Sequence, residues 1–115
     1  MNNGSTNGEA TNEPLDLGDD LVITNTSPRG SVPGTWVSGT IHGYRFEALV
    51  FPEHAEVPEY ELDDSRISKL WVQRLADKNE VFCWERGMQR PAKDATAQAI
   101  VDFLAAGLAE HTYGN

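Results

Sequence analysis

Hydrophobic and polar residues alternate most regularly in residues 34–51, GTWVSGTIHGYRFEALVF. Two β-rich runs flank His42-Gly43, a dipeptide short enough for a two-residue hairpin turn. The register that follows places Gly39 opposite Phe46, whose ring can lie over the glycine backbone. Because side chains alternate along a strand, one side of this hairpin is predicted to face the core through Val37, Ile41, Tyr44, Phe46, Ala48 and Val50.

A second hairpin is predicted from two further runs rich in β-branched and aromatic residues, 67–75 and 80–86. The sequence ADKNE between them favours a type I turn in which Asn79 is left-handed, and this turn pairs Ala76 with Glu80. In this register the even-numbered residues of both strands share one face. The apolar residues on that face are predicted to point inward: Leu70, Val72, Phe82 and Trp84.

Apolar residues recur at three- and four-residue spacing near the C-terminus, which predicts an amphipathic helix over residues 94–111. Asp94 is placed to cap its start and Gly114 to end it. Because glycine lets two backbones approach closely, we expect Gly107 at the tightest contact with the sheet. The inward stripe consists of Ile100, Phe103, Leu104, Gly107 and Leu108.

Together these elements predict an α+β fold, a four-stranded antiparallel meander of two β-hairpins with one C-terminal amphipathic helix packed on one face, in the order β-β-β-β-α. We expect a single α+β domain over residues 31–115. Residues 1–30 are interpreted as a flexible acidic N-terminal arm, because their first two-thirds are rich in Asn, Gly, Thr and acids without an apolar period. Within that arm, residues 21–26 favour a short strand.

The predicted registers also give the second face of the sheet an apolar character. That face is expected to carry Trp36, Leu49, Phe51, Ile67, Trp71, Val81 and Cys83. A fully solvated face does not usually hold two tryptophans. We therefore expect the N-terminal arm, the acidic connection after Phe51 or a second copy of the chain to cover it. The candidate interface residues are Trp36, Leu49, Phe51, Ile67 and Trp71.

Charge divides the chain into two parts. The formal net charge is −9; residues 47–64 hold seven acids and no base, whereas residues 66–93 hold seven bases against three acids. The acidic part suits either a solvated loop or a contact with a basic patch, on a partner or on a second copy. In the basic part, the bases lie near Tyr44, Trp71 and Trp84, which permits a base-stacking platform for nucleic acid. The net charge opposes that alternative, so nucleic acid is an unfavoured partner.

The sequence contains no recognisable group of catalytic residues. The chain lacks the glycine-rich phosphate-binding motifs, and its histidines, His42, His54 and His111, show no metal-ligand spacing. Ser65 and Ser68 have no paired base. Cys83 is the single cysteine and lies in a predicted strand, which is typical of an inert, largely buried thiol. We therefore predict no enzyme activity, no catalytic residue, no cofactor and no metal site.

Length and composition limit the size of the core and the expected location of the protein. With 115 residues, 39% of them hydrophobic, the chain has room for one modest core. No apolar run approaches the length of a membrane span, and the N-terminus does not resemble a signal peptide, so we expect a cytoplasmic protein without membrane contact.

One pattern of residues resembles a family of short uncharacterised bacterial and phage proteins. The pattern comprises a tryptophan, a G-x-x-x-G-Y-x-F-x-A-x-V run, a loop tyrosine, an R-I-S-K-L stretch and an R-G hairpin end. It falls here on Trp36, Gly39, Gly43, Tyr44, Phe46, Ala48, Val50, Tyr60, residues 66–70 and Arg86-Gly87. The resemblance implies a related fold and no catalytic residues, since that family has no assigned activity.

These observations favour a small non-enzymatic protein-interaction module of uncharacterised role. It is expected to act through an unknown protein partner or as a homodimer. The alternative is a small nucleic-acid-binding protein that uses the basic second hairpin.

Overall fold

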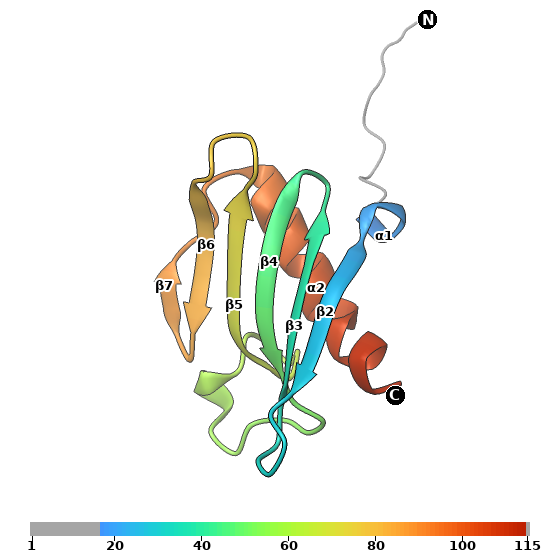
Figure 1. The fold of residues 1–115 in the computed structure, drawn as a ribbon. Coiled ribbons are helices and arrows are strands. Elements are labelled where there is room, and N and C mark those ends of the chain that lie inside the picture. The colour runs from blue at the N-terminus through green and yellow to red at the C-terminus, as the bar shows by residue number, and fades with distance from the viewer. Residues whose placement is uncertain (1–16, 115) are drawn as a thin grey trace, which may run out of the picture.

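The computed structural model describes residues 17–114. A short helix and an edge strand precede the two predicted hairpins, and a long helix closes the fold (Figure 1). In chain order the elements are α1 (Leu17–Asp20), β2 (Val22–Pro28), β3 (Thr35–Ile41), β4 (Tyr44–Val50), the 3-10 helix η1 (Pro58–Tyr60), β5 (Ile67–Arg74), β6 (Glu80–Glu85), β7 (Met88–Arg90) and α2 (Ala95–Tyr113).

The predicted α+β class, antiparallel sheet and C-terminal helix are confirmed, but the predicted number of four strands is wrong. The sheet has six strands in the order β2-β3-β4-β5-β6-β7, all neighbours antiparallel. The strand expected near residues 21–26 is present as β2 and pairs with β3, so the sheet begins before the predicted boundary at residue 30. Strand β7 is three residues long, too short to show a periodic pattern in the sequence.

The first hairpin has the predicted register. Ile41 pairs with Tyr44 and Gly39 with Phe46, and the predicted inward residues of β3 and β4 are buried. His42 has φ 50° and Gly43 has φ 80°. Positive φ at both central residues belongs to the type I′ turn, whose twist matches that of the two strands.

In the second hairpin the even-numbered residues of both strands share one face as predicted, but the strands pair in a different register. Leu70 pairs with Trp84 and Val72 with Phe82, whereas the sequence-based register placed Trp84 opposite Val72. The left-handed residue of the turn is Lys78, with φ 61°, rather than Asn79. The observed pairing is shifted by two residues from the predicted one, and a bulge between Val72 and Gln73 shifts it by one more toward the turn. Leu70, Val72 and Phe82 are buried as predicted, and Trp84 packs against the core while partly exposed.

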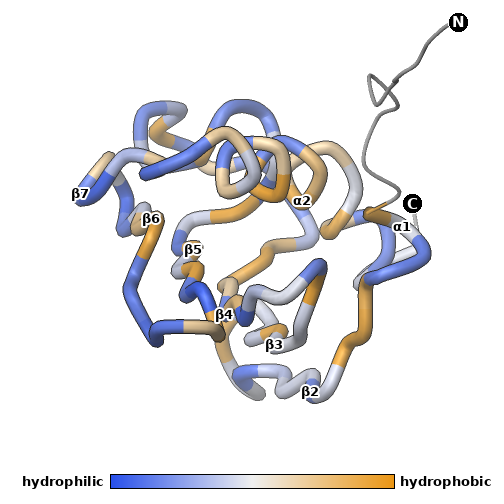
Figure 2. The backbone as a smooth tube through the Cα atoms, turned by 90° about the horizontal axis from the view of Figure 1, so that it is seen from above, coloured by the Kyte–Doolittle hydropathy of each residue, from blue (hydrophilic) through white to orange (hydrophobic). Residues whose placement is uncertain are grey.

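Helix α2 lies on one side of the strands and contacts β3, β4 and β5 (Figure 2). Its start is capped as predicted, because the Asp94 carboxylate accepts a 2.7 Å hydrogen bond from the Ala97 amide, and left-handed Gly114 ends it. The helix runs past the predicted end to Tyr113, whose hydroxyl donates a 2.9 Å hydrogen bond to the Val50 carbonyl. The expectation for Gly107 is wrong, since a Cβ there would meet nothing within 4 Å.

The core lies between α2 and the sheet. It is built from Val37, Ile41, Phe46, Val50, Ile67, Leu70, Val72, Val81 and Phe82 of the strands and Ala97, Ile100, Val101, Leu104 and Leu108 of the helix. The sheet side toward α2 is hereafter the inner face, and the opposite side the outer face. Among residues 17–114, no helix has the length and apolar character needed to cross a membrane.

Candidate functional site

The predicted interface residues are only partly brought together on the outer face. Trp36 is 37% exposed, and Trp71 and Phe51 are half-buried. Leu49 lies on the outer face as predicted but is only 3% exposed. The prediction for Ile67 is wrong, because its side chain is 0% exposed and belongs to the core.

A bulge explains the misplacement of Ile67. Leu49 pairs with Lys69 and Val50 with Ile67, so Ser68 is an extra residue on β5. One extra residue sends the side chain that precedes it to the opposite face. Side-chain alternation counted back from the middle of β5 therefore assigns Ile67, the first residue of the strand, to the wrong face of the sheet.

Arginine side chains cover three aromatic rings on this part of the molecule. The guanidinium carbons lie 5.3 Å from the ring centroid for Arg29 over Phe51 and 5.4 Å for Arg45 over Trp71. Arg86 lies 5.8 Å from the centroid of the Tyr60 ring, in η1. A cation at this distance is attracted to the ring face, and the arginine stem covers apolar area. The covering of the rings that we expected from an arm, a loop or a second copy thus comes partly from neighbouring side chains.

The turn between β2 and β3 covers the rest of this region. Arg29 donates from Nε and Nη2 to the Pro33 carbonyl at 2.9 and 2.6 Å, which closes the turn. A Cβ at Gly34 would lie 3.2 Å from Leu49 and 3.3 Å from Phe51, so the glycine lets the turn backbone rest on those side chains. This contact accounts for the burial of Leu49.

A hollow of about 610 Å³ remains beside this turn, at the end of the sheet where the 51–66 connection also lies (Figure 1). We call it the outer-face hollow. Apolar side chains of Leu49, Phe51 and Tyr60 line it. Four cationic side chains, Arg29, Arg66, Lys69 and Arg86, line it as well, against the carboxylates of Glu53, Glu56 and Glu61. An apolar centre with charged walls suits a ligand that has an apolar side chain next to ionised groups.

The 51–66 connection is folded around a buried carboxylate. The Glu61 side chain is 5% exposed, and its oxygens accept 2.7 Å hydrogen bonds from the Ala55 amide and from His54 Nδ1. Burial alone raises the pKa of Glu61, but hydrogen bonds from the Ala55 amide, from His54 and from the Arg66 backbone, together with the nearby His54 charge, outweigh it, so the pKa lies below its ordinary value. The acidic sequence predicts a solvated or partner-binding loop for this segment, and no local pattern marks the inward turn of Glu61.

Cys83 is half-buried on β6. Burial raises the pKa of its thiol, and the nearby carboxylates of Glu80 and Glu85 raise it further. A raised pKa disfavours the reactive thiolate. The prediction of an unreactive thiol therefore has physical support, although the side chain is more exposed than expected.

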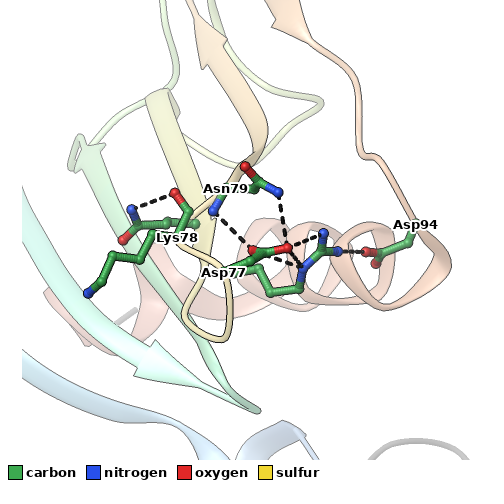
Figure 3. Close-up of polar contacts among 6 residues, drawn as sticks. Asp77, Lys78, Asn79 and Asp94 are labelled. Carbon is green, nitrogen blue, oxygen red and sulfur yellow. Dashed lines mark hydrogen bonds and ion pairs between the residues drawn. The ribbon is translucent and has the colours of Figure 1, made fainter.

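Three bases of the part of the chain between residues 66 and 93 pair with its own carboxylates. Arg74 Nη2 lies 2.9 Å from Asp77 and Nη1 2.7 Å from Asp94, a cluster at the β5–β6 turn (Figure 3). Arg90 pairs with Glu80 at 2.8 Å, and Lys69 lies 3.3 Å from Glu85. Paired cations release few counterions from nucleic acid, so these three residues give little support to the nucleic-acid alternative.

Comparison with known proteins gives one finding. A family model described as a domain of unknown function (DUF7678) matches residues 35–109, from the first residue of β3 to the last turns of α2. Neither a curated protein nor a solved structure matches the chain.

Proposed function

Because this chain belongs to the family of that domain of unknown function, we propose its role from its surface: a non-enzymatic module that binds a partner protein, or a second copy of itself, through the outer-face hollow. The observation that carries the proposal is the hollow itself. It combines half-buried Phe51 and exposed Tyr60 with the cations Lys69 and Arg86 at one end of the sheet. Protein interfaces use such a mixture of an apolar centre and a charged rim.

The chemistry of the hollow defines the partner segment. It should present one apolar or aromatic side chain to Phe51 and Tyr60, with a carboxylate on either side for Arg86, or for Lys69 in exchange for Glu85. A second copy also meets this description. In a two-fold arrangement the acidic connection of one copy, through Glu53, can face the cations of the other, and each contact occurs twice.

Self-association is tested first, by sedimentation equilibrium of the full chain at low and high NaCl. The double substitution Lys69→Glu, Arg86→Glu reverses two cations of the hollow. The double substitution Lys78→Glu, Lys93→Glu makes an equal charge change at two exposed residues outside the hollow and is the matched control. If the protein is a dimer through this surface, we expect a dimer for the wild type and the control, a monomer for the Lys69→Glu, Arg86→Glu variant, and weaker association in salt.

A monomeric wild type points to a different protein as the partner. A photo-reactive phenylalanine at position 51, in the hollow, and one at Gln98, exposed on α2, are then compared in the native cell. The proposal expects a discrete cross-linked protein from position 51 that is lost in the Lys69→Glu, Arg86→Glu background. Equal products from both positions, or a product insensitive to the charge reversal, would contradict it.

Nucleic acid is tested separately by fluorescence anisotropy with single-stranded DNA and RNA at low salt. The pairing of Arg74, Arg90 and Lys69 with carboxylates leads us to expect no binding. Binding that weakens steeply with salt would favour the alternative instead.

A further inference from the structure

Three potential metal ligands come together in the 51–66 connection. His54 Nδ1 lies 2.7 Å from Glu61 Oε2, and Asp64 contributes the third side chain. One ligand atom from each of the three lies within 4.8 Å of the other two, the one such group of His, Cys, Asp and Glu in residues 17–114. We propose that His54, Glu61 and Asp64 form a site for a divalent transition-metal cation of the Zn²⁺ type.

The backbone around these residues is held in place. The Ala55 amide fixes Glu61 Oε1 at 2.7 Å, so that its second oxygen, Oε2, points to His54. On the Asp64 side, the Ser65 amide donates to the Leu62 carbonyl at 3.1 Å, and the Leu62 amide donates to the Ile67 carbonyl at 2.9 Å. The segment that carries Asp64 is thus a closed turn, and the ligand set needs little reordering of its backbone.

The donor set and its dimensions suit a transition metal. Zn²⁺ bonds to nitrogen and carboxylate oxygen of about 2.0–2.2 Å place neighbouring tetrahedral ligand atoms roughly 3.3–3.5 Å apart. The 2.7 Å contact between His54 and Glu61 has to widen to this spacing, and the Asp64 ligand atom already lies within 4.8 Å of the other two. His54 and Asp64 are both exposed and can rotate, while buried Glu61 stays fixed. A histidine nitrogen in a set of three ligands disfavours Ca²⁺ and Mg²⁺, which prefer oxygen.

The proposed site also has room for water as a fourth ligand. A second hollow, of about 670 Å³, lies between the 51–66 connection and α2, and both His54 and Asp64 line it. Glu53 and Glu110 line the same hollow, opposed by Arg66. These additional carboxylates make the surroundings negative overall, which attracts a cation to the site.

A bound ion would link three residues of the 51–66 connection, His54, Glu61 and Asp64. His54 and Glu61 also line the outer-face hollow, so the ion would stiffen one wall of it. The site does not depend on the proposed interaction role, because it is formed by this chain alone and can be measured without a partner.

A single titration series tests the proposal. Chelator-treated full-length protein is titrated with Zn²⁺ by calorimetry, with Co²⁺ by visible absorption, and with Ca²⁺ and Mg²⁺ for comparison. His54→Gln and Asp64→Asn each remove one exposed ligand, and circular dichroism checks that both variants fold. His42→Gln is the matched control, since His42 pairs with Asp20 at 2.9 Å without belonging to a group of three.

We expect one Zn²⁺ per chain, at least tenfold weaker binding in His54→Gln and Asp64→Asn, and unchanged binding in His42→Gln. The imidazole NMR signals of His54, and not those of His42, should shift on addition of Zn²⁺. Absence of Zn²⁺ binding, equal weakening by His42→Gln, or Ca²⁺ binding as tight as that of Zn²⁺ would each overturn the assignment.

Discussion

The two faces of the same sheet are stabilised in different ways. On the inner face, Val37, Phe46 and Val72 are completely buried under α2. On the outer face, Trp71 is only half-buried, lies under the Arg45 guanidinium and donates a 3.0 Å hydrogen bond from Nε1 to Glu80. The inner face is held by the hydrophobic effect and close packing, and the outer face by ring, cation and carboxylate contacts open to water.

This difference changes the meaning of exposed aromatic residues. Two tryptophans on the second face suggested a large buried interface. The Trp71 ring is already covered by Arg45, whereas Trp36 stays 37% exposed. The accessible apolar side chains of the outer-face hollow are half-buried Phe51 and exposed Tyr60. A partner therefore has a small, charged site to bind rather than a whole sheet face.

The largest expected effect is at the centre of the inner face. Phe46→Ala should lower the free energy of unfolding by about 3–5 kcal/mol, because it leaves a cavity in a sealed core. Phe51→Ala is the matched outer-face control and should cost about 1–2 kcal/mol, since that ring is half-buried. Urea unfolding monitored by circular dichroism measures both. Equal losses would refute the distinction between the faces.

A smaller loss is expected where the edge strand crosses close to β3. A Cβ on Gly39 would overlap the Val22 carbonyl oxygen and lie 3.1 Å from the Phe46 ring. Gly39→Ala should therefore cost about 1–3 kcal/mol, because β2 or the ring has to move. Gly107→Ala is the contrasting change, since the added methyl meets nothing within 4 Å and helix propensity predicts a gain of about 0.5–1 kcal/mol. A loss at position 107 would mean that the helix surface is not open there.

Removing a cation from the outer face should have a weaker effect. Arg45→Gln loses the contact with the Trp71 ring and the 2.8 Å pair with Glu47, both solvent-accessible. We expect a loss of about 0.5–1 kcal/mol in urea unfolding, most of it from the ring contact. Glu47→Gln removes only the ion pair and should be nearly neutral. If the two substitutions lower the free energy of unfolding equally, the contact between Arg45 and the Trp71 ring contributes nothing measurable.

The smallest effect concerns pH at the β5–β6 turn (Figure 3). Hydrogen bonds from Arg74, and from the Asn79 amide, lower the pKa of Asp77 from 3.8 to about 2. A lowered folded-state pKa gives stability that is fully present above about pH 4 and is lost as pH falls toward about 2. The stability difference between wild type and Asp77→Asn should shrink over that range. A difference that stays constant from pH 6 to about pH 2 would contradict the assignment.

Much of the fold was predictable because it depends on local patterns. The turn at His42-Gly43 and alternation in β3 and β4 gave the correct register and inward face. The N-cap of α2 at Asp94 and its C-terminal end at Gly114 were also predictable from neighbouring residues alone. Strand β7 was not found, because three residues carry no period. The pairing of β2 with β3 was missed because the turn of residues 29–34 between them is longer than the two-residue turn that marks the first predicted hairpin.

The candidate site was less predictable than the fold. Bulges at Leu49/Val50 and Val72/Gln73 shift the side chains beyond them, and nothing in a strand sequence marks where a bulge occurs. The hollow requires three separate segments to meet at one end of the sheet. The ligand set was visible only as one histidine and two acids in an acidic run, a pattern common in solvated loops.

The sequence by itself determined the first hairpin, the capped helix and the inner face that joins them, since turn chemistry and side-chain alternation act over a few residues. Tertiary structure alone decided that Ile67 enters the core, that Glu61 turns inward to meet His54, and that arginines cover the outer rings. These outcomes depend on which distant backbone leaves room for a side chain, and that is settled only when the strands and the long connection have packed together.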